Sequence, residues 1–104
     1  MIELALDAIP NQRLSAALEG AYWEIEIKTL DNGTTAVSLW RDGETVIQGV
    51  RAMPNRVLIP YAYREAGNFA FLATGDDYPD YPRFGADVRL VYASAAELSE
   101  MRNA

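Results

Sequence analysis

The 104-residue sequence predicts an all-β domain, an antiparallel β-barrel or sandwich of about seven strands with a short C-terminal helix. Apolar and polar residues alternate over most of the chain, a period-two pattern that is typical of strands with one buried face. Asparagine, glycine, aspartate and proline recur between these segments at intervals that favour a sandwich or a barrel. We therefore interpret residues 1–104 as a single domain, of which 94–104 forms a short helical tail.

The alternation predicts where the strands lie. It is clearest in YWEIEIKTL, where Trp23, Ile25 and Ile27 face one side and charged residues face the other. The opening IELAL has the same pattern, and RLSAAL repeats it more weakly. We expect strands at 2–6, 13–18, 22–30, 34–41, 44–53, 68–74 and 87–93. The core is expected to include Ile2, Leu4, Trp23, Ile25, Ile27, Val37, Leu39, Phe69, Phe71, Leu90 and Tyr92.

The turn sequence DNG at 31–33 sets the register of one hairpin. A two-residue Asn-Gly loop would place Ile27 opposite Ser38 and so mix the buried face with the solvent face. A three-residue loop instead pairs Ile27 with Val37, and it places Gly33 in the left-handed conformation. We therefore predict the three-residue loop.

The next turn, Asp42-Gly43, is predicted to be a two-residue type I′ loop. This register places Leu39 opposite Val46. Because Val46 and Ile47 are adjacent, one of them must point away from the main core. The sequence therefore predicts a bulge or a second buried surface at this point.

Segments 54–66 and 94–104 do not follow the strand pattern. Pro54 and Pro60 bracket NRVLI, and proline cannot donate to a central ladder, so we expect a crossover that contains a short strand. In the tail, SAAELSEMR begins with a capping box, in which a serine is followed three residues later by a glutamate. A helix of at most two turns is expected there.

The amino-acid composition excludes most kinds of catalytic and metal-binding site. The chain has no histidine and no cysteine, which removes the commonest general base, the thiol nucleophile and most transition-metal sites. No serine lies in a G-x-S-x-G motif, and the aspartates near residue 77 lack the spacing of a calcium loop. We expect no enzymatic activity, no cofactor and no metal.

The net charge of −6 and the absence of a basic cluster argue against nucleic acid as a sequence-specific partner. The start of the chain has no basic and apolar segments of a signal peptide, and no apolar run is long enough to span a bilayer. We expect a soluble protein that is made in the cytoplasm and has no membrane partner.

The stretch TGDDYPDYPRFG is the strongest candidate for a binding element. Tyr78, Tyr81 and Phe84 recur at every third position, and the proline after each tyrosine makes the segment stiff and extended. Stiffness lowers the entropic cost of docking, and tyrosine supplies a large contact area. The loop either caps its own core or docks on a partner; we assign capping to Phe84 and docking to the two tyrosines.

Arginines near the loops are a second set of candidates, because a guanidinium can clamp a carboxylate on the same chain or on a neighbour. An intramolecular surface pair is the default interpretation of each. The residues proposed for a partner interface are Asp77, Tyr78, Asp80, Tyr81, Arg83, Arg56 and Arg51.

The order of several short motifs resembles that of the baseplate plug proteins of contractile-tailed bacteriophages, of the cyanophage type. The similarity covers residues 1 to about 93, and each motif is weak alone but specific in its order and spacing. The matching motifs are Ile9 to Gln12, Asp42-Gly43, Gly49 to Arg51, Pro54-Asn55, Ile59 to Tyr61, Gly67 to Phe69, and Arg83 to Gly85.

The resemblance implies a structural virion protein without catalysis, located at the centre of the tail baseplate and assembled in the host cytoplasm. It implies contacts with the hub, with the tail tube and with the tape-measure protein, in three or six copies. The family supplies no ligand or cofactor residues. The alternative function is a small carbohydrate-binding β-module that uses Tyr78 and Tyr81 as an aromatic platform.

Overall fold

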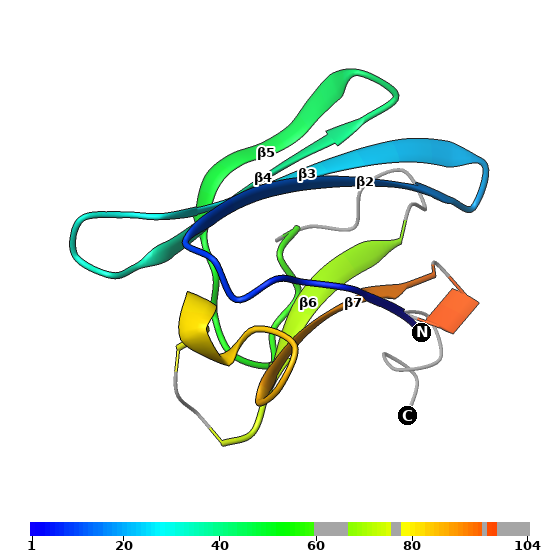
Figure 1. Cartoon of the computed structure of the whole chain (residues 1–104). Helices are drawn as coiled ribbons and strands as arrows, with labels where there is room; N and C mark the ends of the chain where they lie inside the picture. The colour runs from blue at the N-terminus through cyan, green and yellow to red at the C-terminus, as the bar shows by residue number, and fades with distance from the viewer. Residues whose placement is uncertain (60–66, 76–77, 95, 98–104) are drawn as a thin grey trace.

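Seven strands form two antiparallel sheets that face each other (Figure 1). The computed structural model describes residues 1–59, 67–75, 78–94 and 96–97. The strands are β1 (Ile2–Leu4), β2 (Asn11–Leu18), β3 (Ala21–Thr29), β4 (Thr35–Arg41), β5 (Glu44–Arg51), β6 (Asn68–Ala73) and β7 (Val88–Ala93). The all-β prediction is confirmed. Among the described residues the strands close no barrel, so the sandwich is the correct alternative.

One sheet has the strand order β2-β3-β4-β5 and the other has the order β1-β7-β6. The first sheet is a meander of hairpins, whereas the second brings the first and last strands of the chain together. Ile2 lies opposite Tyr92, and Leu4 lies opposite Leu90. The short β1 is therefore an edge strand that depends on β7 for its pairing.

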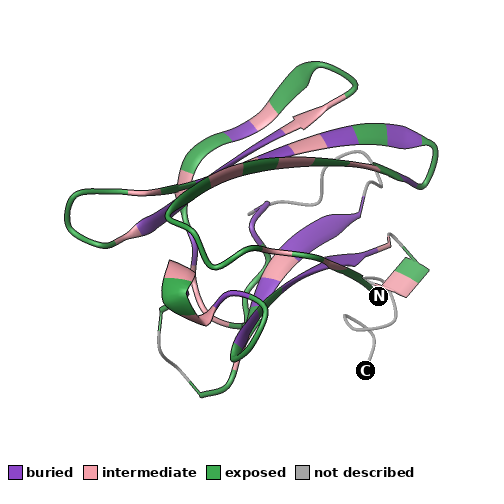
Figure 2. Cartoon of the chain, in the orientation of Figure 1, coloured by how far each residue is buried: buried purple, intermediate pink, exposed green. Residues whose placement is uncertain are grey.

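The core fills the space between the sheets, and Figure 2 shows that the buried residues are concentrated in β3, β4, β6 and β7. Most of the predicted core is confirmed, from Trp23 to Tyr92, with each of those side chains at most 2% exposed. Leu4 is only half-buried, and Ile2 is 51% exposed. The prediction for Ile2 is wrong because this residue begins an edge strand, where the opposite sheet does not cover it.

Three aromatic rings join the two sheets. Trp23 of β3 meets Phe69 of β6 edge to face, with ring centroids 5.0 Å apart, and Phe69 lies 5.0 Å from the ring of Tyr92 on β7. Such pairs contribute about 0.5–1.5 kcal/mol each beyond the burial of their area. Through this cluster Trp23 links the four-stranded sheet to both β6 and β7 of the other sheet.

The Tyr92 hydroxyl adds a polar tie across the same end. It donates a hydrogen bond to the Glu19 carboxylate in the β2–β3 turn and accepts one from the Gly67 backbone N–H. Burial, and then the hydrogen bond and negative charge of Glu19, raise the pKa of Tyr92 far above its ordinary value. A Cβ at Gly67 would lie only 2.2 Å from the hydroxyl oxygen, so the chain needs glycine there.

The predicted register of the first hairpin is confirmed, because Ile27 pairs with Val37 and Gly33 has a φ of +84°. The second turn has positive φ at both Asp42 and Gly43, as a type I′ turn requires.

Leu39, however, lies opposite Ile47 and not opposite Val46, so that part of the prediction is wrong. The predicted bulge at Val46 shifts the register by one residue. A second shift occurs near Gly49, whose N–H donates to Ser38 Oγ at 2.9 Å.

The described part of the crossover lies along the outer edge of β6. Asn55 donates its N–H to the Phe71 carbonyl and Leu58 donates to the Phe69 carbonyl, but the pairing consists of isolated bridges and not of a strand. The buried Asn68 side chain exchanges two hydrogen bonds with the backbone of Ile59. Residues 60–66 lie outside the described residues.

The predicted C-terminal helix is not borne out as an element: of its described residues only 96–97 are helical, and the helical element of the described residues is the short 3₁₀ turn η1 (Tyr81–Arg83). Both hydrogen bonds of the capping box between Ser94 and Glu97 do form, at 3.1 Å each. A capping box satisfies only the backbone groups of the first turn of a helix. The rest of the predicted helix, 95 and 98–104, lies outside the described residues.

We predict that Gly67→Ala lowers the free energy of unfolding by about 1–3 kcal/mol, because the added methyl group overlaps the Tyr92 hydroxyl. Tyr92→Phe should cost about 1 kcal/mol through the lost hydrogen bond. Urea unfolding monitored by tryptophan fluorescence measures both. Tyr22→Phe, at a tyrosine that is 51% exposed, is the matched control and should change little. A Gly67→Ala variant as stable as the parent would contradict the close packing of the Tyr92 hydroxyl against Gly67.

Candidate functional site

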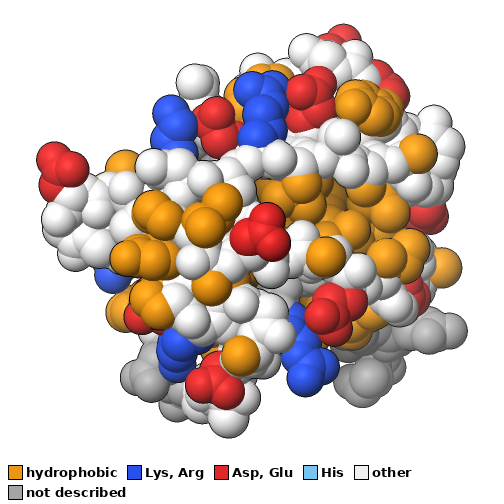
Figure 3. Space-filling model, viewed as in Figure 1, with side chains coloured by type: hydrophobic (Ala, Val, Ile, Leu, Met, Phe, Trp, Pro, Cys, Tyr) orange, Lys and Arg blue, Asp and Glu red, His pale blue; other side chains and the backbone are white. Residues whose placement is uncertain are grey.

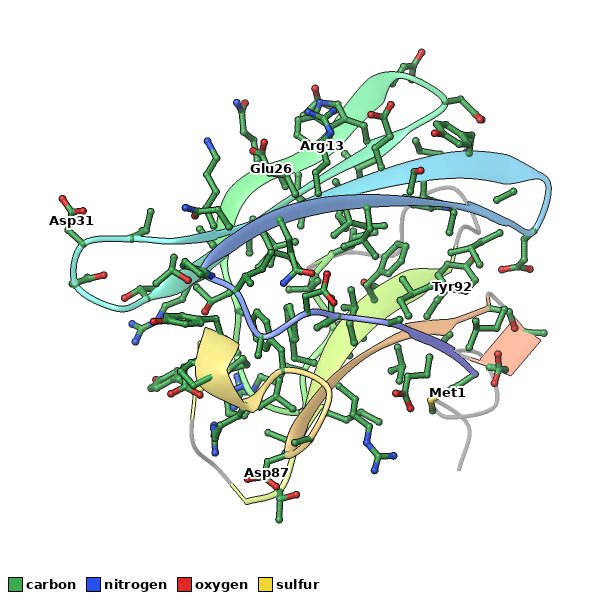
Figure 4. The ribbon with its side chains drawn as sticks, in the orientation of Figure 1. Met1, Arg13, Glu26, Asp31, Asp87 and Tyr92 are labelled. Carbon is green, nitrogen blue, oxygen red and sulfur yellow. The ribbon has the colours of Figure 1, made fainter. Side chains whose placement is uncertain are left out.

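The β6–β7 connection lies at the end of the sandwich opposite the Tyr92 hydroxyl and its hydrogen bonds (Figures 1 and 4). Of its residues, 74, 75 and 78–87 are described, whereas Asp76 and Asp77 lie outside the described residues. Phe84 is 4% exposed and stacks on Phe71 of β6, with ring centroids 5.8 Å apart. The predicted capping of the core by Phe84 is confirmed.

Polar contacts hold the connection in one conformation. Arg83 Nε donates to Asp80 Oδ1 at 2.7 Å, and another guanidinium N–H donates to the Tyr78 carbonyl at 3.0 Å. The buried Thr35 hydroxyl, on β4, donates to the carbonyl of Pro79 at 2.8 Å. Asp80 and Arg83, two of the predicted interface residues, thus make hydrogen bonds within the β6–β7 connection and stabilise its conformation.

The two candidate tyrosines have different environments. Tyr81 begins η1 and packs half-buried against the hydrophobic core. Tyr78 is 49% exposed and is one of the large side chains that the fold leaves at the surface. The exposed aromatic contact area of this loop is therefore concentrated at Tyr78.

Arg51, the last residue of β5, places its guanidinium over the Tyr78 ring, with Cζ 4.2 Å from the ring centroid. A cation over an aromatic face is worth about 0.5–1 kcal/mol at an exposed site. The pair joins a strand of one sheet to the loop that comes after β6 of the other sheet. The sequence singled out both residues but gave no signal that they touch.

A shallow hollow of about 240 Å³ lies beside this pair. Its walls come from the β3–β4 loop (Asn32–Thr35), from Arg51 and Ala52, and from the segment Tyr78–Asp80. Asp31 projects from the tip of the same β3–β4 loop (Figure 4), and the Asp80 side chain is 50% exposed. The hollow thus combines an aromatic ring and a guanidinium with the acidic side chain of Asp80.

Arg56 occupies a separate position. It is exposed and comes directly after Asn55, whose side-chain amide donates to the Gly75 carbonyl at 3.1 Å. Arg56 therefore lies beside the start of the β6–β7 connection. In the described part of the chain, no hydrogen bond or ion pair involves its side chain.

Sequence reasoning missed a second polar cluster, on the outer face of the four-stranded sheet (Figure 4). Arg13 of β2 donates to Glu24 at 2.8 Å, lies 4.0 Å from Glu26, and stacks its guanidinium 4.7 Å from the Trp40 ring centroid. Alternation had placed Glu24 and Glu26 on this face. Only the register of β2 against β3 would have revealed that Arg13 meets them.

The described residues contain no group of three acidic, histidine or cysteine side chains that is arranged to hold a metal ion. None of the helical segments in residues 1–59, 67–75, 78–94 and 96–97 is long and apolar enough to cross a membrane.

Comparison with known proteins gives one family. The family model described as "Cyanophage baseplate Pam3 plug gp18" matches residues 1–95, which include all seven strands and the β6–β7 connection. No curated protein matches the chain.

The difference between the tyrosines gives a stability prediction. Tyr81→Ala should lower the free energy of unfolding by about 2–4 kcal/mol, because it removes a ring that packs on the core. Tyr78→Ala should change stability by about 0.5 kcal/mol or less, since the ring is half exposed and the Arg51 contact is weak. Urea titrations of the two single variants test this, with Tyr22→Ala as a control for an exposed tyrosine. Equal losses for Tyr78 and Tyr81 would contradict the assignment of Tyr78 to the surface.

Proposed function

The chain belongs to the cyanophage baseplate plug family, and we propose that it is a structural virion protein that fills the centre of a contractile-tail baseplate through contacts with the hub and tail-tube proteins. The observation that carries this proposal is the family match over 1–95, which spans the whole described sandwich and not a fragment of it. The tape-measure protein is a third proposed partner. Three or six copies assemble into the tail in the host cytoplasm.

The corner formed by Arg51 and Tyr78 is the proposed contact with a neighbouring protein. Tyr78 is exposed, yet its backbone and ring are both held in place, so little conformational entropy is lost when it docks. Tyrosine and arginine are the residue types that most often dominate interface energy. The acidic rim at Asp80 favours a partner surface with arginine or lysine, which sets orientation more than affinity. Asp77 and Arg56 are proposed to extend this interface.

The net charge of −6 suits a protein at the centre of a tail. Like charge keeps a DNA duplex from adhering to the wall of the channel through which it passes. The charge therefore supports a passive structural role, without sequence-specific binding of nucleic acid.

The second candidate is a carbohydrate-binding module that uses Tyr78 and Tyr81. The exposed Tyr78 beside a polar hollow is the observation that favours it. The stack of Arg51 on Tyr78 weighs against it, because the guanidinium covers one face of the ring on which a sugar would lie.

The test is complementation of a phage that lacks this gene with Tyr78→Ala, Arg51→Ala or the control Tyr22→Ala. Purified tails are then analysed by quantitative mass spectrometry for the number of copies incorporated. We expect incorporation to fall about tenfold or more for Tyr78→Ala and Arg51→Ala, as for a hot-spot residue, and to stay at the parental level for Tyr22→Ala.

Absence of the parental chain from purified tails would refute the structural role. Normal incorporation of both corner variants would refute the corner as the contact. Hits on a glycan array that disappear in Tyr78→Ala would favour the carbohydrate-binding module.

A further inference from the structure

The edge of β2 carries backbone groups that pair with no other strand in the described part of the chain. Tyr22 directs both of its backbone groups toward the β4–β5 turn, since its N–H donates to Asp42 Oδ1 and its carbonyl accepts from the Asp42 N–H, each at 2.8 Å. Tyr22 lies opposite Ala17 of β2. Because hydrogen-bonded and non-hydrogen-bonded pairs alternate in an antiparallel ladder, Arg13, Ser15 and Ala17 all turn their N–H and C=O away from β3.

Among the edges of the two sheets, that of β2 is the one suited to accept another strand. Its pairing with β3 is continuous over all eight residues from Asn11 to Leu18, and the strand contains no proline. By contrast, two register shifts distort β5, the segment 54–58 lies along β6, and β1 has only three residues. Bulges, short strands and covering loops are the usual protection of edges, and β2 has none of them in the described structure.

An apolar opening lies beside this edge. Leu14 and Ala16 of β2 face inward but are only half-buried, and so are Leu4 and Leu6 at the N-terminal end; all four pack against the core. Figure 3 shows hydrophobic side chains exposed in a hollow of this face, where β2 and the N-terminal segment lie nearest the viewer in Figure 1. The described residues therefore leave the sandwich incompletely covered on the side where the edge of β2 is unpaired.

We propose that β2 is a docking edge for an extended segment of another virion protein, which adds to the four-stranded sheet as a fifth strand. Every second side chain of the added segment is apolar and covers Leu14 and Leu4. This spacing follows because successive residues of a strand point to opposite faces of the sheet. The residues between the apolar ones are polar, because they lie on the same solvent-exposed face of the sheet as Arg13, Glu24 and Glu26. This inference rests on the proposed structural role and adds a second contact to the Arg51–Tyr78 corner.

A second copy of this chain is a less suitable occupant. Pairing of β2 with β2 of another copy would make an isologous contact, which closes into a two-fold dimer. Copies arranged in a ring around a tail axis instead meet through heterologous contacts, in which two different surfaces face each other. A segment from a different protein satisfies the edge without imposing a two-fold axis.

Amide hydrogen exchange tests the proposal on the full chain, free and in purified tails. In the free protein, which should be monomeric at micromolar concentration by analytical ultracentrifugation, the amides of Arg13, Ser15 and Ala17 should exchange rapidly. In tails, exchange of these three amides should slow by about 100-fold or more, because a new ladder protects them. Equal exchange in the two states, in tails that contain the chain, would overturn the docking edge and leave the structural role intact.

The variant Ser15→Pro gives a second test. It removes the backbone N–H of residue 15, which the β2–β3 ladder does not use. An added strand would need this N–H, so the substitution should block strand addition. The matched control is Thr45→Pro on β5, an exposed residue whose N–H also faces away from its partner strand. Circular dichroism should show that both free variants are folded. We expect Ser15→Pro to reduce incorporation into tails about tenfold or more and Thr45→Pro to have no effect.

Normal incorporation of Ser15→Pro would overturn the proposal, and so would a free dimer in which residues 11–18 are already protected, since a second copy would then occupy the edge. If either proline variant is unfolded, the exchange experiment on the parental chain decides. Absence of the parental chain from tails would refute the structural role itself, together with this inference.

Discussion

The packing of Trp23 against Phe69 and Tyr92 is the contact on which the rest of the fold depends. The two sheets have no strand in common, and within the described residues no ladder connects them, so side chains must hold them together. Trp23 comes from the four-stranded sheet, and its two partners come from β6 and β7. The Tyr92 hydroxyl, bound to Glu19, then fixes the β2–β3 turn relative to the three-stranded sheet. Because protein interiors are close-packed, a change in the volume of any of these three rings disturbs its neighbours.

The candidate interface depends on this arrangement because its parts come from both sheets. Arg51 ends a strand of the four-stranded sheet, whereas Tyr78 comes after a strand of the other. The buried Thr35 hydroxyl and the buried Phe84 ring both secure the β6–β7 connection. A rotation of one sheet against the other would separate the guanidinium from the ring. Local rigidity at a recognition surface is thus a consequence of the global packing, which suits a protein whose proposed role is to occupy a fixed place in an assembly.

Local periodicity and turn chemistry were enough to predict the strands and the first hairpin. The register of Ile27 against Val37 came from keeping apolar residues on one face, and the bulge at Val46 came from two adjacent apolar residues. Its effect on Leu39 could not be predicted, since a bulge can lie at any of several positions in the ladder. The exposure of Ile2 and the stack of Arg51 on Tyr78 depend on how the sheets are placed, which no local pattern specifies. The same holds for the candidate site, where sequence identified the residue types but not which of them face solvent.

The central claim, that the aromatic contact unites two sheets into one cooperative unit, is tested most directly by a double-mutant cycle. The free energy of unfolding is measured in urea for the parent, for Trp23→Leu, for Phe69→Leu and for the double variant. We predict one cooperative transition and a coupling energy of about 1 kcal/mol or more between the two positions. Additive losses within about 0.3 kcal/mol, or separate transitions for the two sheets, would contradict the claim.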